Sequence, residues 1–180
     1  MTDMNWNELF TYDEATGNLI WKPRTGTPKL VGAFNKRFAG KTAGVKAYSP
    51  NGDPRGISIR VRMDGTKQDY YAHRIISEMF DGPIPEGIQI DHVDRNAFNN
   101  KRSNHRRATS TQNKHNSRKT SRNRSGLKGV CYDQSRELWS AEIRAHGQRM
   151  HLGRYLTKGL AAVARAKAAI RYHGEFARFA

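Results

Sequence analysis

Alternating apolar and polar residues in the first half of the chain predict short antiparallel strands. Residues 57–63 read Ile, Ser, Ile, Arg, Val, Arg and Met, and an Asp-Gly turn separates them from a second strand at 68–72. Strict alternation of this kind is typical of a half-buried antiparallel sheet. A Thr-Gly-Asn turn predicts a further hairpin over residues 10–21. Residues 1 to about 87 are therefore expected to form a β-rich region.

The hydrophobic period changes to that of a helix at residues 73–80, which a Gly-Pro pair follows closely. A short strand is predicted over 88–93, and an Asn-rich loop comes after it. Residues 106–108 are expected to return as a second strand. A Thr-Ser pair is then a suitable N-cap for a helix that runs through Asn113. The segment 88–119 thus has the predicted order strand, loop, strand, helix.

The last third of the chain is predicted to form three short strands and one Ala-rich helix. The strands are expected at 128–132, 138–145 and 148–152, and the helix at 157–172. A helix rich in Ala can approach a sheet closely. The segment 117–126, rich in Ser, Arg and Lys, precedes these elements. It is either a solvated connector or a basic strap along DNA, and its position between two candidate modules favours the strap.

Charge narrows the class of partner. The 180 residues carry a net charge of +16, and residues 95–132 contain eleven Lys or Arg residues and no Asp or Glu. So large a basic run favours a polyanionic partner, and nucleic acid comes before a membrane because we find no basic amphipathic helix with a large apolar face. No segment is apolar enough to span a bilayer, and the N-terminus does not resemble a secretion signal, so the cytoplasm of the host cell is the expected location. The single Cys131 excludes an internal disulfide and a zinc site with several thiolates, and we expect it to be half-buried in a strand.

Asp91 and His92 are the candidates for chemistry. A carboxylate and a carboxamide are hard oxygen ligands that suit Mg²⁺, which commonly takes only one or two carboxylates. A neutral imidazole beside them can take a proton from an attacking water. Such a set suits hydrolysis of a phosphodiester bond. From the residues alone, a hydrogen-bonded polar cluster on a surface loop remains the alternative.

Residues 70–113 resemble the HNH nucleases, in the branch that includes phage homing endonucleases. The resemblance implies a ββα-metal finger with His92 as general base, Asp91 and Asn113 as ligands of a divalent ion, and Asn104 as the residue that orients His92 through its second ring nitrogen. His115 is the alternative to Asn113 as ligand. The features that carry the resemblance are His73-Arg74, the Gly-Pro-Ile-Pro run at 82–85, Asp91-His92-Val93-Asp94, Asn99-Asn100, Asn104 and Asn113.

Two histidines need separate comment. His105 departs from the family, because related sequences place an apolar residue after the middle Asn. His73 is expected to be structural and to anchor the helix before the finger.

Residues 125–177 resemble the APETALA-type (ethylene-response-factor) DNA-binding domain, in which a three-stranded sheet enters the major groove. The resemblance rests on Gly129-Val130, Trp139, Ala141-Glu142-Ile143-Arg144, Gly147, Leu152-Gly153, Thr157 and Gly174 after the Ala-rich helix. It implies that Trp139, Ile143 and Leu152 form the core. The expected DNA contacts are Lys128, Glu142, Arg144, Arg149 and His151 in this domain, with Lys119, Arg122 and Arg124 in the strap.

These patterns together predict an α+β protein: a small N-terminal antiparallel sheet leading into a ββα-metal HNH finger, then a separate three-stranded sheet packed on one helix. The expected domains are 1–116, with the finger at about 88–119, a linker at 117–126, and 127–180. The expected function is metal-dependent cleavage of double-stranded DNA by a monomer, with Mg²⁺ or Mn²⁺ and no small-molecule cofactor. The alternative is a non-cleaving DNA-binding regulator that keeps the finger as a scaffold. RNA binding is disfavoured because both resemblances are to DNA-binding modules.

Overall fold

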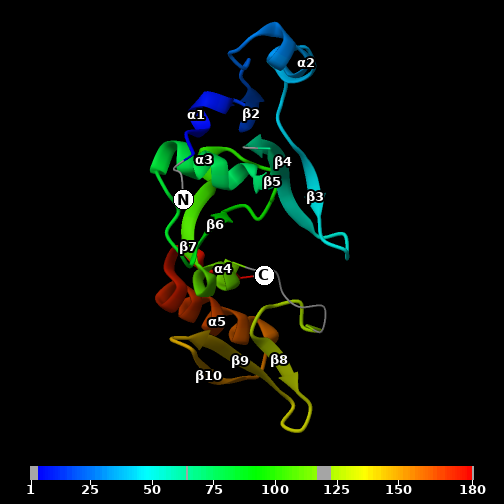
Figure 1. The fold of residues 1–180 in the computed structure, drawn as a ribbon. Coiled ribbons are helices and arrows are strands. Elements are labelled where there is room, and N and C mark those ends of the chain that lie inside the picture. Colours follow the sequence, from blue (N-terminus) through cyan, green and yellow to red (C-terminus); the bar gives the residue numbers. More distant parts are fainter. Residues whose placement is uncertain (1–3, 64, 117–122, 180) are drawn as a thin grey trace. The chain divides into compact units, whose positions relative to one another are not determined.

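The computed structural model describes residues 4–63, 65–116 and 123–179, and Figure 1 shows their helices and strands. Contacts divide the chain into two compact units, residues 1–108 and 109–180. Both units combine helices with small antiparallel sheets, which confirms the predicted α+β class. Among the described residues, no helix combines the length and the apolar character needed to cross a bilayer.

The N-terminal unit contains the two predicted hairpins. Phe10 pairs with Trp21 at the open end of the first hairpin, and Arg60 pairs with Asp69 across the second. The elements of this unit are α1 (Trp6–Leu9), β1 (Phe10–Asp13), β2 (Asn18–Trp21), α2 (Pro28–Phe38), β3 (Val45–Tyr48), β4 (Pro54–Met63), β5 (Thr66–Tyr71), α3 (Ala72–Asp81), β6 (Ile88–His92), the 3₁₀ turn η1 (Arg102–Asn104) and β7 (His105–Thr109).

The sequence patterns did not predict α1, α2 or β3. The helix α2 begins with Pro28 in its first turn, where proline costs no hydrogen bond, and it covers Trp21 with Phe34 at a ring distance of 5.4 Å. The strand β3 pairs only with β4 at an edge of the sheet, and its Val45 is exposed. An edge strand without a buried face leaves no alternation to detect.

The core of the N-terminal unit joins its hairpins to α3. This helix packs on β4, β5, β6 and α1, and it therefore supports the strand β6 directly. Six side chains of the core are almost completely buried: Phe10, Leu19, Ile59, Val61, Ile75 and Ile76.

The C-terminal unit is a three-stranded sheet covered on one face by α5, as predicted (Figure 1). Trp139, Ile143 and Leu152 contribute to its two apolar clusters, as expected. Cys131 lies in a strand but is exposed, which corrects the expectation that it is half-buried. The elements are α4 (Ser110–Asn116), β8 (Val130–Asp133), β9 (Leu138–Ala145), β10 (Gln148–Tyr155), α5 (Lys158–His173) and the 3₁₀ turn η2 (Gly174–Phe176).

Candidate functional site

Asp91 and His92 end the strand β6, which pairs with β7 in a two-stranded ribbon. Both side chains are buried, with relative exposures of 5% for Asp91 and 8% for His92. Neighbouring residues of a regular strand point to opposite faces, so burial of both means that each face of the strand end is covered. A buried carboxylate beside a buried imidazole is costly unless both are paired.

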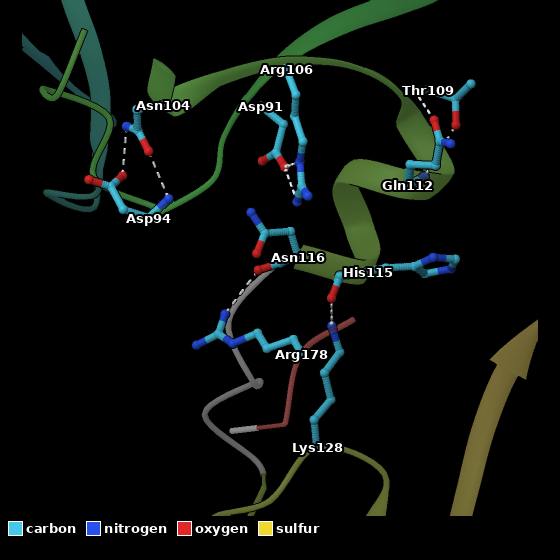
Figure 2. Close-up of polar contacts among 10 residues, drawn as sticks. All are labelled: Asp91, Asp94, Asn104, Arg106, Thr109, Gln112, His115, Asn116, Lys128 and Arg178. Atoms are coloured by element: carbon cyan, nitrogen blue, oxygen red, sulfur yellow. Dashed lines mark hydrogen bonds and ion pairs between the residues drawn. The ribbon is translucent and has the colours of Figure 1, made fainter. Parts of the chain in front are cut away.

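Arg106 of β7 pairs with the Asp91 carboxylate. Its Nε and Nη2 atoms lie 2.9 Å and 2.7 Å from Asp91 Oδ2, and its side chain is 14% exposed (Figure 2). The sequence patterns placed Arg106 in a strand without giving it a role in the site. The signal that could have identified it is opposite charge on adjacent antiparallel strands.

Asn100 contacts the His92 ring. Its Oδ1 lies 3.4 Å from His92 Nε2. An oxygen acceptor at this position favours the tautomer that carries the proton on Nε2 and the lone pair on Nδ1. Burial lowers the pKa of His92 below the usual 6.5, although Asn100 and the nearby carboxylates act in the opposite direction. The imidazole is therefore neutral near pH 7, as a proton acceptor must be.

Asn104 fixes the turn after β6. Its Oδ1 accepts from the Asp94 backbone N–H at 2.9 Å, and its Nδ2 donates at 2.9 Å both to Asp94 Oδ1 and to the Asn99 carbonyl. Figure 2 shows the Asn104 and Asp94 side chains facing each other. Asn104 was expected to contact the second ring nitrogen of His92. Among the described residues its side chain instead bonds to Asp94 and Asn99, and Asn100 contacts the His92 ring. Asn104 thus fixes the backbone turn that follows His92.

The N-terminal hairpin supports the loop that carries Asn100. The Tyr12 hydroxyl donates to the Asn100 carbonyl at 3.3 Å and accepts from the Arg102 N–H at 2.8 Å. Gly17 has a φ of 78°, and a Cβ there would lie 2.5 Å from the backbone nitrogen of Lys101. The hairpin therefore approaches the loop so closely that only glycine fits at its turn.

Two further histidines surround the His92 ring. His73 of α3 and His105 of β7 meet it edge-on, with ring centroids at 5.1 Å and 4.9 Å. Burial, with the neighbouring His92, lowers the pKa of His73 to about 3 and that of His105 to about 4. Among the described residues, neither ring nitrogen of His105 has a hydrogen-bond partner. His73 links α3 to the ribbon, in keeping with its expected structural role.

Asn113 lies on α4, which the contacts group with the C-terminal unit. Thr109 caps this helix as predicted: its backbone N–H donates to Gln112 Oε1 at 2.8 Å, and Gln112 N–H donates to Thr109 Oγ1 at 3.2 Å (Figure 2). His115 stacks on His173 with ring centroids 3.6 Å apart. The helix was expected to reach about residue 119, and residues 117–122, with Lys119 and Arg122, lie outside the described residues.

The outer face of the C-terminal sheet carries four of the eight expected DNA contacts. Arg144 pairs with Arg149, and Glu142 with His151, across the β9–β10 ladder. The intervening Ile143 packs with α5, so these four side chains point away from the helix. Arg144, Arg149 and His151 are exposed, and Arg149 Nε donates to Glu142 Oε2 at 2.6 Å.

Arg124 and Lys128, two other expected DNA contacts, lie outside this face. Arg124 is exposed and lines a groove of about 730 Å³ beside β8. Lys128 is half-buried, and its Nζ donates to the carbonyls of Lys114 and His115 at the end of α4. The catalytic, metal-binding and DNA-binding roles expected for these residues stay predictions, because geometry alone assigns no role to a side chain.

Residues 70–115 match the HNH endonuclease family. Protein 3.8 of Escherichia phage T7 is 37% identical to this chain over 117 residues, which cover 63% of this chain and 95% of the phage protein. The chain belongs to the HNH endonuclease family. A solved structure described as DNA binding and cleavage by the HNH homing endonuclease I-HmuI aligns with a TM-score of 0.41 and 18% identity, covering 92% of this chain and 85% of the other. A TM-score of this size does not establish a shared fold.

The family match places the HNH segment of the endonuclease. It begins in β5 and ends in α4, so it contains the ribbon β6–β7 and all the residues expected to act in catalysis. The predicted enzyme class is thereby confirmed.

We expect that replacing His105 makes the N-terminal unit less sensitive to acid. The pKa of His105 is about 4 in the folded protein and near 6.5 in the unfolded chain. The unfolded chain therefore binds a proton that the folded protein does not, and the free energy of unfolding decreases as the pH falls from 6.5 toward 4. His105→Leu should reduce the loss of unfolding free energy between pH 7 and pH 5 by about 1–2 kcal/mol. Urea denaturation at the two pH values measures this.

His105→Gln is the matched control. It removes the titrating ring, so it should flatten the pH dependence as His105→Leu does. His105→Leu should also raise the free energy of unfolding at pH 7 by about 1 kcal/mol, because it removes buried polar atoms without partners, whereas His105→Gln keeps a buried polar group and should not. Equal pH dependence in the wild type and both variants would contradict the account.

Proposed function

We propose that this endonuclease hydrolyses phosphodiester bonds of double-stranded DNA with a divalent ion held by Asp91 and Asn113 and with His92 as general base. The observation that supports it most is the buried Asp91-His92 pair at the end of β6, in which Arg106 fixes the carboxylate and Asn100 lies against the imidazole. A surface hydrogen-bonding cluster would leave both side chains exposed. Two adjacent buried polar groups with separate partners suit two separate tasks.

The donor atoms fit a hard cation. Among the described residues, no three His, Cys, Asp or Glu side chains come together as a metal-binding group. One carboxylate and one amide oxygen suit Mg²⁺, or Mn²⁺, better than Zn²⁺, since Mg²⁺ keeps several waters. When bound, the ion supplies positive charge that stabilises the phosphate in the transition state and the leaving 3′ oxygen.

The proton moves through His92. With Nε2 directed at Asn100 Oδ1, Nδ1 is the atom that accepts a proton from the attacking water. Asn104 acts indirectly, because it ties the turn at Asp94 and so holds the strand end that carries the imidazole. Arg106 keeps the Asp91 carboxylate in one orientation.

DNA binding is proposed for the outer face of the C-terminal sheet, on the basis of the resemblance of residues 125–177 to APETALA-type domains and of the exposed cations on this face. The major groove of DNA is wide enough to admit a two-stranded β-ribbon such as β9–β10. Arg154, on β10, is a further exposed cation of this sheet that the sequence patterns did not single out. The proposed contacts are Arg124, Glu142, Arg144, Arg149 and His151, with Lys119 and Arg122 in the segment outside the described residues.

A monomer in the host cytoplasm is the proposed acting form. One HNH segment supplies one site, so a monomer would nick one strand at each encounter.

A non-cleaving DNA-binding regulator is the second candidate. It is favoured by the same basic sheet face, which serves binding whether or not cleavage follows. It gives no reason for the buried Asp91–Arg106 pair or for a neutral imidazole at His92.

Replacing His92 separates the two candidates. We expect wild-type protein with Mg²⁺ to cut supercoiled duplex DNA. His92→Ala should cut at least about 100-fold more slowly, the usual effect of removing a general base. Gel analysis of nicked and linear products measures the rate. His146→Asn is the matched control, because His146 is exposed in a turn with φ 50°, a conformation that Asn tolerates.

Equal rates for the wild type and His92→Ala would remove His92 from the mechanism. Tight DNA binding without cutting by the wild type would favour the regulator.

The identity of the second ligand is tested by a Mg²⁺ titration. Asn113→Ala is expected to raise the Mg²⁺ concentration needed for half-maximal cleavage or to abolish cleavage. His115→Phe preserves a flat ring for stacking on His173 and should leave the Mg²⁺ dependence near that of the wild type. The opposite pattern would make His115 the ligand.

A further inference from the structure

The last turn of α4 is held by side chains from the C-terminal sheet domain. Three consecutive carbonyls of this helix, those of Lys114, His115 and Asn116, accept hydrogen bonds from these side chains. Lys128 Nζ lies 3.0 Å from both the Lys114 and the His115 carbonyls, and Arg178 Nη1 lies 3.1 Å from the Asn116 carbonyl. Figure 2 shows Lys128 reaching the His115 carbonyl and Arg178 reaching the Asn116 carbonyl.

Packing joins α4 to the same domain. His115 stacks on His173 at the end of α5, and the turn η2 contacts α4 with Phe176 and Asn116 both buried. Burial, together with Arg165 and Arg178, lowers the pKa of Lys128 to about 8, so the side chain still carries its proton near pH 7.

We infer that Lys128 and Arg178 are positioning residues for the metal ligand Asn113: they fix α4, and through it Asn113, to the C-terminal domain. This inference rests on the proposed function, because it gives Asn113 a ligand's task. Asn113 lies one residue before the first clamped carbonyl, that of Lys114, so the clamp acts on the same turn of helix. The unit that carries the proposed DNA-binding face would then also carry one proposed ligand of the ion.

The rival role for Lys128 is the direct DNA contact that the family resemblance implies. The two roles differ in what the residue touches. A phosphate contact contributes to binding and to its salt dependence, whereas a clamp on helix carbonyls contributes to the order of α4 and to the response to Mg²⁺.

The test compares full-length wild type with Lys128→Met, Lys128→Arg and Arg178→Met. Lys167→Met is the matched control, because Lys167 is an exposed lysine of α5. Three quantities are measured: amide hydrogen exchange of residues 113–116 without metal or DNA, DNA affinity without metal at several salt concentrations, and the cleavage rate across a Mg²⁺ titration.

We expect Lys128→Met and Arg178→Met to speed exchange in α4 while β9 and β10 stay protected. Both should slow cleavage at limiting Mg²⁺ by about tenfold, the lower end of the effect of residues that orient metal ligands. DNA affinity and its salt slope should match the wild type. Lys128→Arg, which still donates to carbonyls, should recover most of the loss, and Lys167→Met should change none of the three.

Unchanged hydrogen exchange in α4 would overturn the inference. It would also be overturned if Lys128→Met weakened DNA binding and reduced the salt dependence of the DNA affinity by about one unit of slope, as for a lost phosphate contact. If Lys128→Met unfolds the domain, Arg178→Met decides, since it removes the contact with the Asn116 carbonyl and leaves Lys128 in place. Exchange is measured without catalysis, so failure of the clamp is distinguishable from failure of the proposed function, which His92→Ala reports.

Discussion

The burial of the Asp91 carboxylate is the constraint on which the rest of the N-terminal unit depends. A charge with 5% exposure costs several kcal/mol unless a partner compensates it, and removing one member of such a pair is more damaging than replacing both. Arg106 compensates Asp91, but only if β6 and β7 stay paired. The ribbon therefore needs the turn fixed by Asn104 and the loop fixed by Tyr12. Each of these contacts preserves the pairing that makes the buried charge tolerable.

The same burial prepares the chemistry. His92 shares the dry environment of Asp91, and burial keeps its imidazole neutral. The rings of His73 and His105 pack against it, and this packing leaves buried nitrogens on His105 without hydrogen-bond partners among the described residues. Local cost of this kind is common at functional sites, where the surrounding fold must stabilise an arrangement that would not persist alone.

The sequence was informative where one pattern determines one contact. Alternation at residues 57–63 predicted the sheet, and the order strand, loop, strand, helix predicted the finger, because side-chain period reflects backbone geometry directly. Arg106 was missed because Arg106 and Arg107 are adjacent and only strand pairing shows which one faces Asp91. The contact of Asn100 with His92 was missed because Asn99 and Asn100 are adjacent in a loop, where no periodic pattern shows which amide faces the ring. Lys128 was assigned to DNA because the resemblance covers the sheet domain without α4, so no pattern could show a contact between the two.

The two proposed ligands differ in how they are held. Asp91 is fixed by an ion pair within the ribbon, whereas Asn113 is carried by a short helix that depends on Lys128 and Arg178. An ion held in this way requires both supports to be in place.

The central claim is that Asp91 holds the ion and His92 moves the proton. Mn²⁺ binding to the protein on uncut duplex DNA, followed by electron paramagnetic resonance or calorimetry, tests it most directly. The account predicts that His92→Ala binds Mn²⁺ as the wild type does but does not cleave, and that Asp91→Ala loses the bound ion as well as cleavage. Wild-type Mn²⁺ affinity in Asp91→Ala, or loss of the ion in His92→Ala, would contradict it.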